Sequence, residues 1–176
     1  IPDRKTEGYG PSIQGFEKLI SSGSKLIFTV DCGTLSFDTI EFSQKKNTDV
    51  LVLDHHQSEI NLPNAHSVVN PNRLDDKSSL QYLCAAGVSF MFLVSTNREL
   101  RSVDWFKKNS INEPNLIDYL DLVSLGTVCD VVPLVGLNKP ETIFNNVVLP
   151  QTDGPRRAYA PLSFQSILIS LSCLLY

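Results

Sequence analysis

The sequence predicts an α/β fold, a mostly parallel sheet with helices on both faces. The segments "KLIFTVDCG" (25–33) and "DVLVLDHH" (49–56) each begin with a continuous apolar run of strand length, which is typical of parallel strands buried on both sides. Between them, residues 36–47 have apolar side chains at helical spacing and a basic last turn, as a helix prefers. This order of strand, helix and strand predicts one parallel βαβ unit.

The remaining elements follow from local signals. Residues 11–23 predict a helix that begins at Pro11 and ends at Gly23, with an apolar stripe between them. The other expected elements, in chain order, are a third strand at 66–72, a mostly buried helix at 79–100, a helix at 115–127, and a short strand or turn at 128–134 that carries Asp130.

Composition narrows the class of protein. The 176 residues suffice for one domain, and 42% of them are hydrophobic. A net charge of −4 argues against nucleic-acid binding by bulk electrostatics, but leaves room for a local basic groove or for metal-mediated capture of phosphate. The four cysteines show no CxxC spacing, so we expect buried thiols in the cytoplasm. The apolar run at 161–176 is shorter than the roughly 20 residues that span a bilayer, so no membrane anchor is expected.

Acidic and imidazole side chains follow the two predicted parallel strands. Asp31 ends the first, and Asp54, His55 and His56 end the second. Carboxyl ends of parallel strands share one rim, where ligands of open α/β sheets bind. Because neighbouring strands lie roughly 4.8 Å apart, a carboxylate from one and an imidazole from the other can hold the same ion. The alternative is that Asp31 only forms a turn or caps a helix.

The two adjacent histidines are expected to have different roles. Successive side chains of an extended backbone point in opposite directions, so we expect one histidine to bind metal and the other to face substrate. Asp54 is expected to accept a hydrogen bond that fixes the tautomer of an imidazole. A carboxylate-rich site with one imidazole favours Mn²⁺ or Mg²⁺ over zinc. The chemistry that fits is hydrolysis of a phosphate ester.

Five motifs in sequence order carry a family resemblance: "TVDCG", "LDHHQ", "VVNPNR", "AAGVSF" and "LGTVCDVVPL". Together with the opening "IPDRKTEGYG", they resemble the DHH phosphoesterase superfamily, and within it the RecJ-like single-stranded-DNA exonucleases of bacteria. The resemblance extends from residue 1 to about residue 139. It implies a 5′-to-3′ exonuclease of recombination and repair with a pair of Mn²⁺ or Mg²⁺ ions.

The resemblance also implies roles for individual residues. Asp31, His55 and Asp130 match metal ligands, and His56 matches the histidine that faces the scissile phosphate. The "NPNR" motif matches a position of contacts to phosphate or to a domain interface, and its residues are Asn70, Asn72 and Arg73. Their alternative role is a capped turn.

The chain departs from the family pattern at both ends. Family members carry a DxD motif that supplies two further carboxylates, and no DxD occurs in this sequence. We therefore expect residues 1–140 to form a partial DHH phosphoesterase domain with an incomplete fold, weakened metal binding and impaired activity. Residues 141–176 match no expected pattern and are predicted to be a divergent, loosely packed tail.

Two other functions stay open. One is a phosphatase, oligoribonuclease or pyrophosphatase that acts on short substrates. The other is a non-catalytic replication or repair scaffold, although the retained Asp31, His55, His56 and Asp130 favour an enzyme. The partners expected for the leading interpretation are single-stranded DNA and a single-strand-binding protein or helicase.

Overall fold

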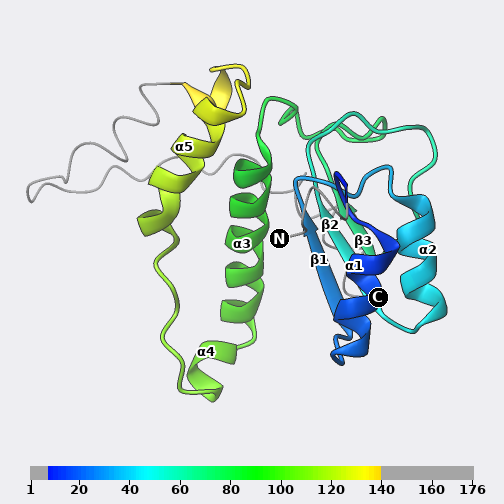
Figure 1. Cartoon of the computed structure of the whole chain (residues 1–176). Helices are drawn as coiled ribbons and strands as arrows, with labels where there is room; N and C mark the ends of the chain where they lie inside the picture. The colour runs from blue at the N-terminus through cyan, green and yellow to red at the C-terminus, as the bar shows by residue number, and fades with distance from the viewer. Residues whose placement is uncertain (1–7, 140–176) are drawn as a thin grey trace, which may run out of the picture. The chain divides into compact units, whose positions relative to one another are not determined.

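The computed structural model describes residues 8–139, which form two units, 8–81 and 82–139 (Figure 1). The predicted tail at 141–176 lies outside the described residues. The first unit contains α1 (Ile13–Ser21), β1 (Leu26–Val30), α2 (Phe37–Lys45), β2 (Asp49–Leu53) and β3 (Ser67–Val69). The second contains α3 (Ala85–Ser102), α4 (Trp105–Lys108), α5 (Leu120–Cys129) and the 3₁₀ helices η1 (Leu116–Tyr119) and η2 (Gly136–Asn138).

The sheet of the first unit is fully parallel, with strand order β1-β2-β3. Val30 of β1 lies beside Leu53 of β2, which lies beside Val69 of β3. The three strands therefore end level with one another. The predicted α/β class and the βαβ unit formed by β1, α2 and β2 are confirmed.

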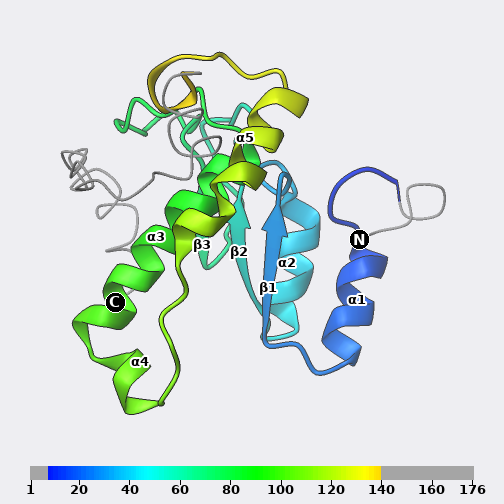
Figure 2. The same ribbon diagram turned by 90° about the vertical axis from the view of Figure 1, so that its left-hand side faces the viewer.

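Helices α1 and α2 pack on the same face of this sheet (Figures 1 and 2). One buried cluster joins the two helices to all three strands, and it consists of Phe16, Ile27, Ile40, Val50, Val52 and Val68. Burial of each such side chain stabilises the folded state by roughly 1.5–3 kcal/mol. This cluster fixes the strands whose ends carry the candidate site.

The expected burial on both faces holds for β2 but not for β1. Residues 50–53 of β2 are all buried. In β1, Leu26, Phe28 and Val30 are 45–50% exposed, whereas Ile27 is buried in the cluster. The continuous apolar sequence of β1 is therefore not matched by continuous burial among the described residues.

Helix α1 begins later than the sequence suggests. Pro11 was expected to open the helix, but Ser12 is the N-cap, and its Oγ accepts a hydrogen bond from the Gly15 N–H (3.0 Å). Gly23 follows the helix with φ +94°, as expected for the residue that ends it.

The second unit differs more from expectation. The helix predicted at 79–100 begins only at Ala85, after Cys84, whose sulfur accepts a hydrogen bond from the Gly87 N–H. The strand or turn predicted at 128–134 is wrong for its first residues, because α5 runs to Cys129 and Asp130 is its C-cap. The N–H of Asp130 donates to the Gly126 carbonyl (3.0 Å), which continues the helical pattern.

Helices α3 and α5 pack closely within residues 82–139. A Cβ added at Gly126 of α5 would lie 2.8 Å from the Ala86 Cβ of α3, so the contact requires glycine. The other side of α5 is apolar and exposed, with Leu122, Leu125 and Val128 between 57% and 65% exposed. No helix among residues 8–139 combines the length and the apolar character needed to cross a bilayer.

The substitution Gly33→Ala, in the loop after β1, should destabilise the first unit by about 3 kcal/mol. Its φ is +115°, and a new Cβ would lie 2.5 Å from Thr29 Oγ1 and 3.1 Å from Val52 Cγ1. Gly23→Ala is the matched control, because Gly23 has φ +94° but no heavy atom within 4 Å of the added Cβ, so its cost should be only about 1–2 kcal/mol. Urea unfolding measures both. Equal losses would show that the crowding at Gly33 contributes nothing.

Candidate metal centre

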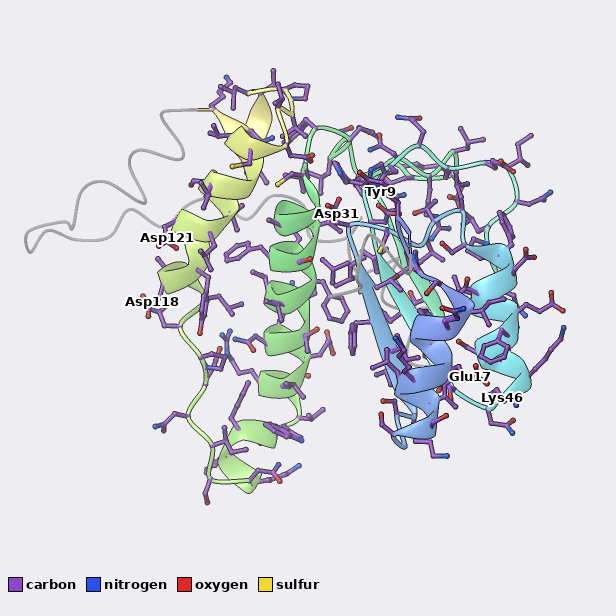
Figure 3. All side chains as sticks on the ribbon, viewed as in Figure 1. Tyr9, Glu17, Asp31, Lys46, Asp118 and Asp121 are labelled. Carbon is purple, nitrogen blue, oxygen red and sulfur yellow. The ribbon has the colours of Figure 1, made fainter. Side chains whose placement is uncertain are left out.

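Three polar residues stand at equivalent positions, each directly after a strand. Asp31 follows β1, Asp54 follows β2 and Asn70 follows β3. The backbone ladder continues into these loops, because Asp31 N–H donates to the Leu53 carbonyl (2.9 Å) and Asp54 N–H donates to the Val69 carbonyl (3.0 Å). Figure 3 shows Asp31 at the carboxyl end of β1. The expectation that the loop ends meet at one rim is confirmed.

Asp31, His55 and His56 form a cluster of possible metal ligands. Each offers one ligand atom, and these atoms lie within 4.8 Å of one another. Oδ1 of Asp31 lies 3.2 Å from Nε2 of His55. Asp31 has φ +64°, a left-handed conformation that aspartate tolerates better than most residues. The strand register and this turn together bring the carboxylate to the imidazoles.

The two histidines differ from the sequence-based expectation that they point in opposite directions. Both belong to the cluster with Asp31, and their rings meet edge to face with centroids 4.7 Å apart. The reason is that β2 ends at Leu53, so strand alternation no longer applies. Oδ1 of Asp54 accepts hydrogen bonds from the backbone N–H groups of His55 (2.8 Å) and His56 (3.3 Å) and so holds this turn.

Asp54 is buried behind the cluster and is held by hydrogen bonds. Its Oδ1 lies 2.7 Å from Nδ1 of His56, and its Oδ2 accepts from the Thr34 N–H (3.0 Å). Burial acts to raise the pKa of Asp54, but the hydrogen bonds, first that of the His56 ring and then those of Thr34, outweigh it and lower the pKa to about 2.

The charge of Asp54 decides the tautomer of His56. An ionised carboxylate only accepts hydrogen bonds, so Nδ1 of His56 must carry the hydrogen. Nε2 of the neutral ring then keeps its lone pair, which is the form that binds a metal ion or accepts a proton. This geometry matches the expectation that Asp54 fixes an imidazole tautomer.

The asparagine side chains of the "NPN" turn bond to other groups of the protein. The Asn70 side chain is buried and bonds to Thr34 and to the His56 carbonyl. The Asn72 amide nitrogen donates to the His55 carbonyl, and its amide oxygen lies 3.5 Å from Nε2 of Gln57. The predicted phosphate contact by Asn70 finds no support here, because its amide hydrogens are used within the site. The alternative of a capped turn fits these contacts better.

Arg73 is likewise engaged within the protein. Its Nε and Nη2 donate to the two carboxylate oxygens of Asp75 (2.9 and 2.6 Å), and its Nη1 donates to the Val68 carbonyl (2.8 Å). The hydrogen bond from Arg73 lowers the pKa of Asp75. Because the Arg73 guanidinium already binds a carboxylate with two N–H groups, it must release that carboxylate before it can bind a phosphate in the same way. Phosphate contact by Arg73 therefore stays a prediction without support from this geometry.

Cys32 stands beside Asp31 but is not suited to bind metal as a thiolate. Burial, followed by the negative charges of Asp54 and Asp31, raises the pKa of its thiol. Its sulfur donates to the Val30 carbonyl (3.4 Å). The thiol is therefore protonated at neutral pH, although Cys32 is half-buried and Cys129 is exposed, so the expected burial of the cysteines holds only for Cys84 among the described residues.

The cluster fits a divalent ion in geometry and chemistry. Two ligand atoms bound at right angles to an octahedral ion at roughly 2.1 Å lie about 3 Å apart, close to the separation between Asp31 and His55. Asp31 is 61% exposed, so the cluster is open to solvent on its acidic side. A carboxylate with imidazoles and no thiolate favours Mn²⁺ or Mg²⁺ over a structural zinc site.

Asp130 lies in the unit formed by residues 82–139, at the C-cap of α5. Its role as a metal ligand stays a prediction. Thr34 is the residue that the sequence analysis missed, since it links the loops after β1, β2 and β3 through its N–H and hydroxyl groups. The available signal was its place three residues after Asp31, in the same strand-end loop.

Comparison with known proteins identifies the family of this chain. The family profile "DHH family, N-terminal domain" matches residues 1–127. The chain belongs to the DHH family. The "LDHHQ" motif contains the Asp54, His55 and His56 described above.

The similar curated proteins are exonucleases. The chain is 40% identical over 134 residues to the single-stranded-DNA-specific exonuclease RecJ of Haemophilus influenzae, covering 76% of this chain and 23% of that protein. It is 38% identical over 139 residues to RecJ of Escherichia coli, covering 79% of this chain and 24% of that protein. The chain therefore spans about a quarter of the length of these relatives.

A solved structure has the same fold. The crystal structure of exonuclease RecJ bound to manganese is 29% identical to this chain and superimposes with a TM-score of 0.57. The match covers 81% of this chain and 33% of that one. The sequence motifs, the parallel sheet and the comparisons thus agree on a RecJ-like DHH domain.

The charge of Asp54 should make stability depend on acid pH. Its folded pKa of about 2 lies below the ordinary value of 3.8, so the stabilisation is present above about pH 4 and is lost as the pH falls toward 2. The loss should be about 2 kcal/mol. Urea unfolding between pH 2 and 6 measures it, and Asp54→Asn is the control that should lose this part of the dependence. An unchanged pH profile in Asp54→Asn would contradict the assignment.

Proposed function

We propose that this chain is the metal-binding core of a RecJ-like nuclease that hydrolyses phosphodiester bonds of single-stranded DNA from the 5′ end, with Mn²⁺ or Mg²⁺ as cofactor. The observation that carries the proposal is the cluster of Asp31, His55 and His56, whose ligand atoms lie within 4.8 Å of one another at the sheet rim. The similarity to exonucleases named RecJ, and to a RecJ structure that contains manganese, supports it.

The exposure of the two imidazoles supports different roles for them. The His55 side chain is 12% exposed and contacts Asp31, so these two residues are proposed to hold the ion. The His56 side chain is 60% exposed, so it is proposed to face the scissile phosphate, while its ring stays within the ligand cluster and close enough to contact the ion. Asp130 is proposed as a further ligand on the basis of the family motif alone.

The chemistry divides between the ion and the chain. A bound divalent ion would activate a water molecule and neutralise charge on the phosphate. Asp31 supplies the negative charge that attracts the ion. Asp54 keeps the hydrogen of His56 on Nδ1, so that Nε2 carries the lone pair when the ring is neutral. This lone pair can bind the ion or accept a proton during hydrolysis.

The same ligands indicate weak binding by this chain. Mn²⁺ and Mg²⁺ favour about six, mostly oxygen, ligands, whereas the described cluster offers three side chains with one carboxylate. We therefore infer impaired activity for the sequence as given. A place in DNA recombination and repair, partnership with a single-strand-binding protein or helicase, and a cytoplasmic location are inferences from the family. The thiols of Cys32, Cys84 and Cys129 are free, which supports a reducing compartment.

Metal binding should depend on His55 and not on the third histidine. In calorimetric titration with Mn²⁺, His55→Ala should weaken binding at least about tenfold, because a ligand is removed. His66→Ala is the matched control: His66 precedes β3, and its ring lies 3.9 Å from Asp49 at the start of β2, away from the rim. Equal affinity in wild type and His55→Ala, or no binding by either, would contradict the proposed metal site.

Substrate length separates the competing functions. With Mn²⁺ at saturating concentration, the chain should shorten a long single-stranded oligonucleotide from its 5′ end, and Asp31→Asn should abolish this by removing charge from the ion site. Gel analysis of 3′-labelled DNA, beside a dinucleotide and pyrophosphate, measures the preference. Hydrolysis of only the short substrates would favour the phosphatase or oligoribonuclease. Metal binding without any hydrolysis would favour the scaffold.

A further inference from the structure

The side-chain amide of Asn70 is buried at the centre of the rim. The residue is 3% exposed and directly follows β3. Nδ2 donates to the hydroxyl of Thr34 (2.9 Å) and to the main-chain carbonyl of His56 (2.8 Å), while Oδ1 accepts from the Asn72 N–H (2.8 Å). Both amide hydrogens and the amide oxygen are therefore used.

The partners fix which way the amide faces. A main-chain carbonyl only accepts, so Nδ2 must face His56, and a main-chain N–H only donates, so Oδ1 must face Asn72. The hydroxyl of Thr34 then acts as the acceptor of the second amide hydrogen. One small planar group thus joins the loops after all three strands.

These bonds reach the imidazole of His56 by two routes. Asn70 holds the main chain of His56 directly. It also holds Thr34, whose N–H binds Oδ2 of Asp54, while Oδ1 of the same carboxylate binds the His56 ring. Both members of the bond between Asp54 and His56 are therefore anchored by one amide.

We propose that Asn70 is a positioning residue for the metal cluster, in that its amide fixes the orientation and tautomer of His56. The expected effect of Asn70 on metal binding rests on the proposed function, whereas its expected effect on the His56 ring does not. It replaces a contact between Asn70 and substrate phosphate. Asparagine suits the position because aspartate offers no donors, serine offers one, and glutamine is longer by a methylene group.

The matched control is another buried asparagine. Asn138 is also 3% exposed, and its Nδ2 donates to two main-chain carbonyls, those of Tyr82 and Pro133. Asn70→Ser and Asn138→Ser therefore each remove donors from two acceptors, and both should lower the unfolding temperature. Only Asn70→Ser should alter His56.

The first readout needs no metal. In ¹⁵N spectra of the full chain labelled at histidine, near pH 8, His56 of the wild type should show one tautomer, with hydrogen on Nδ1 and well-separated ring nitrogens. Asn70→Ser should bring the two nitrogen signals together as the tautomers exchange, and Asn138→Ser should not. An unchanged His56 pattern in folded Asn70→Ser would overturn the proposal.

A second pair of variants keeps the test decisive if Asn70→Ser does not fold. Thr34→Val removes the acceptor of the Asn70 amide with little change of shape, whereas Thr34→Ser keeps the hydroxyl. The His56 pattern should change in Thr34→Val and be retained in Thr34→Ser. The same pattern in both variants would overturn the proposal.

Titration with Mn²⁺ separates this proposal from the proposed function. Asn70→Ser should weaken Mn²⁺ binding about tenfold or more, as loss of a group that orients a ligand does, and Asn138→Ser should leave it unchanged. A changed His56 tautomer with unchanged Mn²⁺ affinity would overturn the role of Asn70 in metal binding. Absence of Mn²⁺ binding in the wild type would instead overturn the proposed function, while the spectra still decide whether Asn70 positions His56.

Discussion

The hydrogen bonds around the Asp54 carboxylate are the interaction on which the rest of the site depends. A buried negative charge is costly unless several donors compensate it. Here the donors are two backbone N–H groups of the histidines, the ring of His56, and the N–H of Thr34 from the neighbouring loop. The need to satisfy one carboxylate therefore determines both the turn that carries the histidines and the position of the loop after β1.

The sheet supplies the frame within which this charge can act. Equal strand ends bring Asp31, Asp54 and Asn70 to one level, and the cluster around Ile40 and Val52 keeps the strands from shifting. A slip of one residue would send every side chain to the other face. Packing on one face of the sheet thus controls the positions of the side chains at its rim.

The described residues combine a hydrogen-bonded rim with exposed apolar surfaces. At the rim, hydrogen bonds satisfy the Asp54 carboxylate and the Asn70 amide. In contrast, the outer face of β1 and one side of α5 expose apolar residues, Phe28 and Leu125 among them. The chain spans about a quarter of the length of the curated relatives that it matches. The ligand cluster and its supporting loops lie within 50 residues of sequence, which is why a short chain still assembles them.

The sequence by itself determined the parallel βαβ unit and the meeting of Asp31 with the histidine pair, because apolar runs and strand ends are local signals whose geometry is general. It misplaced the residues directly after Thr127, where α5 continued to Cys129 in a segment predicted to be a short strand or turn. It left Asn70 and Arg73 open between substrate contact and a capped turn, and it expected the two imidazoles to point in opposite directions. Only the tertiary structure decided these points, because a side chain bonds to whatever donors and acceptors the fold brings near it, and Thr34, Asn70 and His56 lie far apart in sequence.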